Sequence, residues 1–248
     1  MEIKTFEEGL ERIKPTIRRL TTLFLLGKKV VVKGKENFIT EGPNIIVGNH
    51  IGSFKDIAVL FKIVPRPIFF TANEMIFDKV SFEFLIRKHL KRHLKEFGLF
   101  LNRLLFPIKT PFVNFITTNV GRIGTIPVDS SFGYRGMKLV LKKWEEYLQQ
   151  GKAVVILQGW GRVMKKDSHP YISSFKSGFS ILASRLFEQG ILVPVTPVVM
   201  FGTHVPWLIP GKIRINIGEP IYCNGGAEEF RNALEQRTKA LLIELLKS

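Results

Sequence analysis

A short apolar run that leads directly into a histidine constrains the fold of this chain more than any other feature. The run, Ile45-Ile46-Val47, is β-branched and follows the turn pair Gly42-Pro43. Such a run is typical of a buried strand. Open α/β sheets usually carry their chemistry at the C-terminal ends of their strands, which is where Asn49 and His50 would lie. The sequence therefore predicts an α/β fold with a functional site at this strand end.

The interval between His50 and Asp56 decides whether the two side chains can cooperate. A general base needs an imidazole to take the proton and a carboxylate to fix its tautomer and stabilise the imidazolium. Six positions on a continuous helix rotate by roughly 240°, so the side chains meet only if the chain bends, as Gly52 permits. Ser53 then suits an N-cap, with Asp56 in the first helical turn. On spacing alone, a structural histidine beside an aspartate that complements the helix dipole fits equally well.

The positive charge of the chain narrows the classes of partner. Its 37 lysines and arginines outnumber 21 acidic residues, which gives a net charge of +16 and a pI near 10.0. Such an excess favours nucleic acid, an anionic lipid surface, an acidic carrier protein or a phosphorylated substrate. We find no RNA-binding signature, zinc-finger spacing or Walker loop in the sequence, so we expect no nucleic acid partner. The 21 phenylalanines suit a membrane-facing surface.

Cysteine usage and apolar run length bear on the cellular compartment. The single cysteine, Cys223, excludes an internal disulfide and fits a reducing compartment. Glutamates interrupt the apolar positions near the start, so we expect no signal peptide. No apolar run reaches the roughly 18 residues that span a bilayer, so any membrane contact is expected at the surface.

The remaining pattern alternates strands and helices. We expect one α/β domain over residues 29–248, preceded by a helical segment over residues 1–28 that suits either membrane anchoring or packing. Further strands are expected at residues 29–33, 68–70, 123–128, 153–157, 192–199 and 212–217, and helices at residues 133–149 and 227–247. Prolines in the segment 192–199 suit an edge strand or the wall of a groove for an acyl chain.

Residues 78–113 form a basic amphipathic stretch. Apolar residues recur at helical spacing from Phe82 to Leu105, and cations gather on the opposite side. We expect one helix, or two broken at Gly98, followed by a proline-broken loop around residues 106–112. Such helices lie in the lipid interface, although a core-facing helix with a solvated basic face fits equally well. The residues expected to contact membrane are Arg87, Lys88, Lys91, Arg92, Phe97 and Phe100.

The pair Asn49-His50 with Asp56, preceded by Glu41-Gly42-Pro43, resembles the first motif of the glycerolipid acyltransferases. That family includes lysophosphatidic acid and glycerol-3-phosphate acyltransferases. Its motif usually has four residues between the histidine and the aspartate, whereas this chain has five. The resemblance implies that His50 is the general base and that Asp56 orients it, unless the extra residue leaves the orienting role open.

Two later segments resemble the second and third motifs of the same family, with departures. Residues 123–129 match the second motif, but Ser130 stands where an arginine for the substrate phosphate is expected, and Arg135 lies nearby as a substitute. Residues 158–162 match the third motif, usually Phe-Pro-Glu-Gly-Thr-Arg, with Gln158 at the glutamate position. The resemblance implies an oxyanion contact near Gly159 and a phosphate contact from Arg162.

Two further segments match the family well. Phe175-Lys176-Ser177-Gly178 resembles the Phe-Lys-x-Gly sequence after the third motif, and it offers Lys176 as a second phosphate contact at a helix start. Residues 193–197 resemble the apolar fourth motif, Val-Pro-Val-x-Pro. In all, the resemblance covers about residues 34–222.

The resemblance implies an α/β fold with a mixed central sheet flanked by helices. It also implies transfer of a fatty acyl group from a thioester to a hydroxyl of a lysophospholipid, in phospholipid biosynthesis. The donor is acyl carrier protein or acyl-CoA, no metal or organic cofactor is required, and the expected location is the cytoplasmic face of the cell membrane. Because the second and third motifs are altered, a lipid-binding protein that kept the fold and lost catalysis is the alternative.

Overall fold

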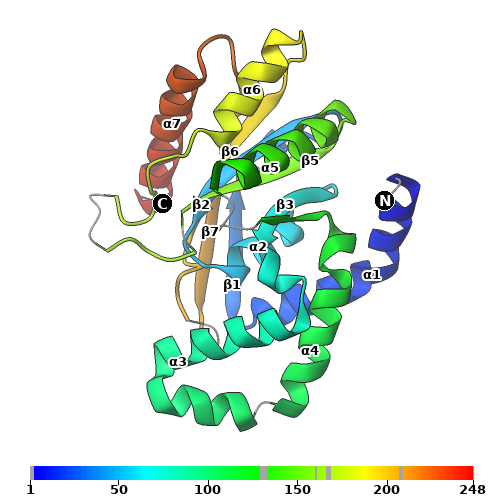
Figure 1. The fold of residues 1–248 in the computed structure, drawn as a ribbon. Helices are drawn as coiled ribbons and strands as arrows, with labels where there is room; N and C mark the ends of the chain where they lie inside the picture. Colours follow the sequence, from blue (N-terminus) through cyan, green and yellow to red (C-terminus); the bar gives the residue numbers. More distant parts are fainter. Residues whose placement is uncertain are drawn as a thin grey trace. The chain divides into compact units, whose positions relative to one another are not determined.

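The computed structural model describes residues 3–104, 106–128, 133–159, 161–165, 169–206 and 209–247. They form a mixed α/β fold with helices around a central sheet, as predicted (Figure 1). The chain divides into two compact units, which are described separately. The larger unit comprises Lys14–Ile68 and Leu141–Ser248, and the smaller comprises Met1–Ile13 and Phe69–Val140.

Five strands of the larger unit lie in the order β1-β7-β6-β2-β5. Their bounds are β1 Lys28–Lys33, β2 Asn44–His50, β5 Ala153–Gly159, β6 Pro194–Phe201 and β7 Gly211–Ile217. The pair β6–β7 is antiparallel and the other pairs are parallel. A short strand, β8 (Ile221–Tyr222), also pairs antiparallel with β6. The predicted mixed sheet is therefore confirmed.

The core of the larger unit lies around β2, whose residues are buried from Asn44 to Asn49. Because successive residues of β2 point to opposite faces of the sheet and are buried on both, the strand reads as a continuous apolar run rather than an alternating one. Helix α7 packs on β6 and β7, and α6 packs beside α7 (Figure 1). The helices that belong wholly or partly to this unit are α1 Ile3–Phe24, α2 Phe54–Ile63, α5 Gly133–Gln149, α6 Gly178–Glu188 and α7 Ala227–Lys247, with a short 3-10 helix, η1, at Lys35–Asn37.

The prolines of β6 do not mark an edge strand, so that expectation was wrong, whereas the groove wall for an acyl chain stays a prediction. Strand β6 lies between β2 and β7, and its residues are buried as far as Met200. On the antiparallel side, β8 pairs with Pro194 and Val195, whereas β7 begins to pair at Val198. Pro197 falls between these two partners, so its missing N–H removes no ladder hydrogen bond on that side.

The smaller unit contains the parallel pair β3 (Ile68–Asn73) and β4 (Thr125–Val128) and two contacting helices, α3 and α4. The remaining 3-10 helices are η2 (Glu74–Ile76) and η3 (Val120–Ile123). Helix α3 (Lys79–Leu104) is kinked at Lys95, where φ is 51°, and not at Gly98. Gly98 lies within the helix after the kink and is buried.

The predicted proline-broken loop after α3 is helical instead. Helix α4 runs over Phe106–Asn119 with Pro111 inside it. Pro107 lies in the first turn, where a missing N–H removes no helical bond. Pro111 follows one turn later, so only the hydrogen bond to the Pro107 carbonyl is lost. Burial of Val113 and the contact between Phe112 and Phe82, with ring centroids 6.3 Å apart, hold this helix against α3.

Candidate active site

Two parallel strands of the larger unit end together at the predicted site. In the pairing of β2 with β5, Asn49 lies opposite Gln158 and His50 lies opposite Gly159. Strand pairing therefore brings the first and third predicted motifs side by side at one edge of the sheet.

The His50 and Asp56 side chains meet across a bend in the chain. Nδ1 of His50 lies 2.8 Å from Oδ2 of Asp56, and the Asp56 carboxylate is fully buried. The same oxygen accepts hydrogen bonds from the backbone N–H groups of Ile51 at 3.0 Å and Gly52 at 2.7 Å. The five intervening residues therefore do not separate the pair, because the bend wraps the backbone around the carboxylate.

The bend differs in detail from the prediction. The left-handed residue is Ser53, with φ of 55°, and its side chain makes no capping hydrogen bond. Ser53 therefore occupies the predicted N-cap position of α2, but its contribution there is conformational. Gly52 is required for space: a Cβ there would overlap Cβ of Thr203 and lie 2.7 Å from the carbonyl carbon of the same residue. The bend therefore packs directly against the backbone of Thr203, which follows β6.

The hydrogen bond to Asp56 assigns the tautomer of His50. An ionised carboxylate only accepts hydrogen bonds, so Nδ1 carries the proton and Nε2 keeps its lone pair. A Cβ at Gly161 would lie 3.3 Å from Nε2, and Gly161 has φ of 68°. Glycine at this position therefore leaves room beside the nitrogen that can accept a proton. With 26% of its side chain exposed, His50 is accessible.

Glycine residues hold the end of β5 close to His50. Gly159 has φ of 122°, and a Cβ there would lie 2.9 Å from the His50 carbonyl oxygen. The Gly161 N–H donates to that same oxygen at 3.2 Å. Because this N–H already has an acceptor, it is unsuited to binding an oxyanion. Gly159 therefore remains the predicted oxyanion contact.

Gln158 connects β5 to the segment before α6. Its side chain is buried, and Oε1 accepts a hydrogen bond from the Lys176 backbone N–H at 3.0 Å. The amide thus keeps the acceptor that a glutamate would supply at this position. Two of the three predicted phosphate contacts, Arg162 and Lys176, have exposed side chains. The Arg135 side chain and Ser130 lie outside the described part of the structure.

Sequence reasoning gave no role to several buried polar residues around the pair. Asn49 is fully buried, donates to the carbonyls of Tyr171 and Met200 at 2.9 Å each, and accepts from the Met200 N–H at 2.8 Å. His204 packs against the rings of Tyr171 and Phe201. Burial lowers the pKa of the His204 imidazole, and the cation of Lys55 lowers it further.

Lys55 was also missed. Its side chain is 5% exposed, and Nζ donates to the Val205 carbonyl. Burial lowers the pKa of the Lys55 ammonium most, the cation of Lys28 adds to this, and the Asp56 carboxylate opposes it. The sequence held one signal: a lysine in the first turn of a helix, where the dipole disfavours a cation.

The smaller unit carries the residues expected to contact membrane. Arg87, Lys88 and Lys91 are exposed, whereas the Arg92 side chain lies outside the described residues. Phe97 and Phe100 are 60% and 61% exposed. Before the kink at Lys95, Phe82 is half-buried, whereas Val80 and Phe84 are exposed. Within the described residues, no helix is long and apolar enough to cross a membrane.

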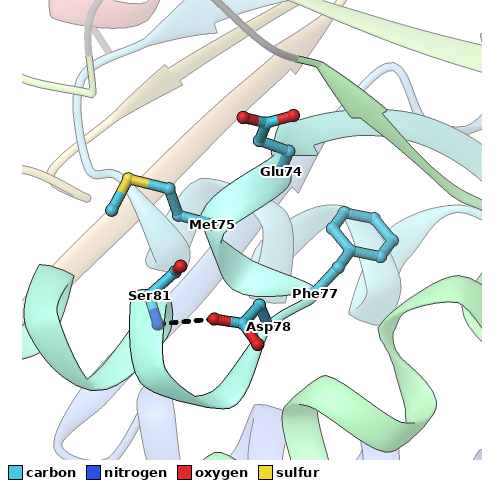
Figure 2. A pocket seen from close by; sticks show the side chains of 5 residues that line it. All are labelled: Glu74, Met75, Phe77, Asp78 and Ser81. Atoms are coloured by element: carbon cyan, nitrogen blue, oxygen red, sulfur yellow. Dashed lines mark hydrogen bonds between the residues drawn. The ribbon is translucent and has the colours of Figure 1, made fainter.

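A pocket of about 290 Å³ lies at the start of α3 in the smaller unit (Figure 2). Its lining residues are Glu74, Met75, Phe77, Asp78 and Ser81, none of them a predicted site residue. The Asp78 carboxylate accepts from the Ser81 N–H at 2.8 Å, which lowers the pKa of Asp78 and caps α3. Across the described chain, no three His, Cys, Asp or Glu side chains gather into a metal-binding group.

Comparisons with known proteins agree with this arrangement. A family model described as Acyltransferase matches residues 29–201. The crystal structure of the 1-acyl-sn-glycerophosphate (LPA) acyltransferase PlsC from Thermotoga maritima matches with a TM-score of 0.58 and 22% identity, covering 95% of this chain and 79% of that one. No curated protein sequence matches. The match to the solved structure supports the fold, and the family model covers both β2 and β5.

Proposed function

This chain belongs to the acyltransferase family, and we propose that it moves a fatty acyl group from an acyl thioester to a hydroxyl of a lysophospholipid, as in phospholipid biosynthesis. The observation that carries the proposal is the hydrogen bond of 2.8 Å between His50 and the buried Asp56. A carboxylate that holds Nδ1–H leaves Nε2 as the base, and the space beside Gly161 lets a substrate reach it. The similar Thermotoga maritima protein is an LPA acyltransferase, which supports the acceptor class.

The reaction would proceed by direct attack on the thioester. The acceptor hydroxyl oxygen bonds to the thioester carbonyl carbon while its proton passes to Nε2 of His50. The carbon–sulfur bond then breaks, and the leaving thiolate takes the proton from the imidazolium. Asp56 stabilises the imidazolium between these steps. The backbone N–H of Gly159 would hold the oxyanion, because fixed donors stabilise charge that develops on the carbonyl oxygen. No metal or organic cofactor is needed for these steps.

The acceptor phosphate would be bound by Arg162 and Lys176, with Arg135 as a further contact. Arg162 follows Gly161, which lies beside Nε2 of His50, and a guanidinium binds phosphate through paired hydrogen bonds. The Lys176 backbone is fixed to Gln158, one residue before the strand end. Both cations are therefore attached to the backbone that borders His50. The net charge of +16 suits an acidic acyl carrier protein or acyl-CoA as donor.

An acyl transfer assay of the purified protein tests the proposal. A panel of lysophospholipids, each tried with acyl carrier protein and CoA thioesters, should give an acylated product with at least one pair. Vesicle binding without any transfer would instead favour the alternative function, a lipid-binding protein that has lost catalysis. Salt-sensitive binding to DNA or RNA without vesicle binding would contradict both.

Replacing Arg162 by alanine should chiefly raise the KM for a phosphorylated acceptor. An arginine–phosphate contact contributes to ground-state binding and is worth about 1.5–3 kcal/mol when charge-assisted, so we expect about a 10–100-fold rise. Steady-state kinetics with phosphorylated and unphosphorylated acceptors measure this rise. Lys165→Ala, which removes another exposed cation from the same segment, is the matched control. Equal losses for both acceptors would make Arg162 a residue of the turn and not of the phosphate site.

We also propose that α3 docks on the cytoplasmic face of the cell membrane. Phe97, Phe100 and Leu104 are each at least 60% exposed, and exposed apolar side chains near cations are typical of interfacial helices. Val80 and Phe84, before the kink, are exposed as well. We propose that the α/β domain over residues 29–248 carries both this surface and the active site, and that residues 1–28 form a membrane-associated helical segment.

Replacing Arg87, Lys88, Lys91 and Arg92 together by glutamine should weaken binding to anionic vesicles. Each cation near the surface contributes about 1 kcal/mol, so co-sedimentation should show a loss of affinity of several orders of magnitude at low salt. The matched control replaces four exposed cations of the larger unit, Lys29, Lys35, Lys142 and Lys212, by glutamine. An equal loss in this control would mean that net charge alone, and not α3, drives binding.

A further inference from the structure

The segment 202–206, which follows β6, packs on the bend that carries the catalytic pair. Thr203 is fully buried, and no side chain fits at Gly52 because of it. The N–H of Gly52 in turn donates to Asp56 at 2.7 Å. A shift of Thr203 would therefore move a hydrogen-bond donor of the carboxylate that orients His50.

Two lysines hold this segment in place. Lys55 donates to the Val205 carbonyl, and Lys28 donates to the carbonyls of Pro206 at 3.1 Å and Ile209 at 2.5 Å. Only Lys55 also belongs to the bend, since its backbone N–H donates to the Gly52 carbonyl at 3.2 Å. Contacts therefore run in a closed loop from Gly52 to Thr203, along the chain to Val205, and back through Lys55.

Lys55 occupies a position that is unfavourable for a lysine on local grounds. It lies in the first turn of α2, where the helix dipole disfavours a cation, and its side chain is 5% exposed. Lysine is almost never buried to this extent unless it is paired. The buried Asp56 carboxylate on the neighbouring residue and the Val205 carbonyl provide the compensation.

We propose that Lys55 is a positioning residue for the His50–Asp56 pair and acts by holding the segment 202–206 against Gly52. It touches neither the substrate nor the reacting atoms in this scheme. The expected effect on kcat rests on the proposed acyl transfer. The expected effect on the hydrogen bond between His50 and Asp56 can be measured without any activity.

Lys55→Met tests the proposal, with Lys62→Met as the matched control. Lys62 is an exposed lysine near the end of the same helix. Methionine keeps the length of the side chain but removes the cation beside the buried Asp56 carboxylate. Removing one member of a buried charged pair is destabilising, so we expect Lys55→Met to fold with a lowered Tm. A small misplacement of a reacting group is enough to lower kcat by about 10–100-fold, whereas KM should stay within about threefold. Lys62→Met should change neither.

NMR of histidine-labelled protein gives the second readout. The Nδ1 proton of His50, assigned by its loss in His50→Ala, reports the hydrogen bond to Asp56. We expect this signal to vanish in Lys55→Met, to persist in Lys62→Met, and to return in Lys55→Arg, which keeps a cationic donor.

The proposal is overturned if folded Lys55→Met keeps kcat within about threefold of wild type and retains the Nδ1 signal. If Lys55→Met does not fold, Thr203→Gly decides instead, because it removes the side chain that contacts Gly52. Loss of the signal in that variant supports the proposal, and its retention overturns it. If the wild-type protein transfers no acyl group, the proposed function fails, but the NMR signal of His50 still tests the role of Lys55. The two failures are therefore distinguishable.

Discussion

Replacing His50 by alanine is expected to lower kcat/KM for acyl transfer by about 10²–10⁴-fold, the usual effect of losing a general base. Without the imidazole, the acceptor oxygen must attack while still protonated. The fold should persist, because Asp56 keeps the hydrogen bonds from the N–H groups of Ile51 and Gly52. Steady-state assays together with thermal unfolding measure both quantities.

His169→Ala is the matched control for this loss, since His169 is an exposed histidine in the segment after β5. It should leave both kcat and Tm unchanged. If His50→Ala retains activity within about threefold of wild type at an unchanged Tm, His50 has no part in the mechanism.

Asp56→Asn is expected to lower kcat by up to about 10⁴-fold, the loss found for the same change in a Ser-His-Asp triad. His50, Ile51 and Gly52 all bond to one oxygen of Asp56. An asparagine oxygen at that position can accept all three hydrogen bonds, but it carries no charge and no longer stabilises the imidazolium that forms when His50 takes the proton. The fold should change little, because the substituted side chain has almost the same shape.

The control for this change is Asp78→Asn, which alters an aspartate at the start of α3 in the smaller unit. It should leave kcat unchanged. The Asp56→Asn result also distinguishes an aspartate that orients His50 from one that only complements the helix dipole. A carboxylate that merely complemented the helix dipole would contribute to stability alone, so a fall in Tm at unchanged kcat would contradict the orienting role.

The sequence by itself determined the local elements and the identity of the pair. The apolar run at residues 45–47 predicted β2, and the periodicity of residues 133–149 predicted α5 with both bounds correct. Gly52 permitted the bend that brings His50 to Asp56, although the spacing alone did not require it. These predictions succeeded because hydrophobic periodicity and turn residues report the local backbone and its burial.

Only the tertiary structure decided which distant segments meet. It placed β6 between β2 and β7, although its prolines had suggested an edge. It also packed Thr203 against Gly52 and joined Lys55 to Val205. Strand order and side-chain partners depend on contacts between residues far apart in the chain. The hydrophobic pattern along a single strand or helix does not report them, because it is the same whichever neighbour packs against that element. The local sequence therefore supplies the proposed catalytic groups, whereas packing between strands fixes their geometry.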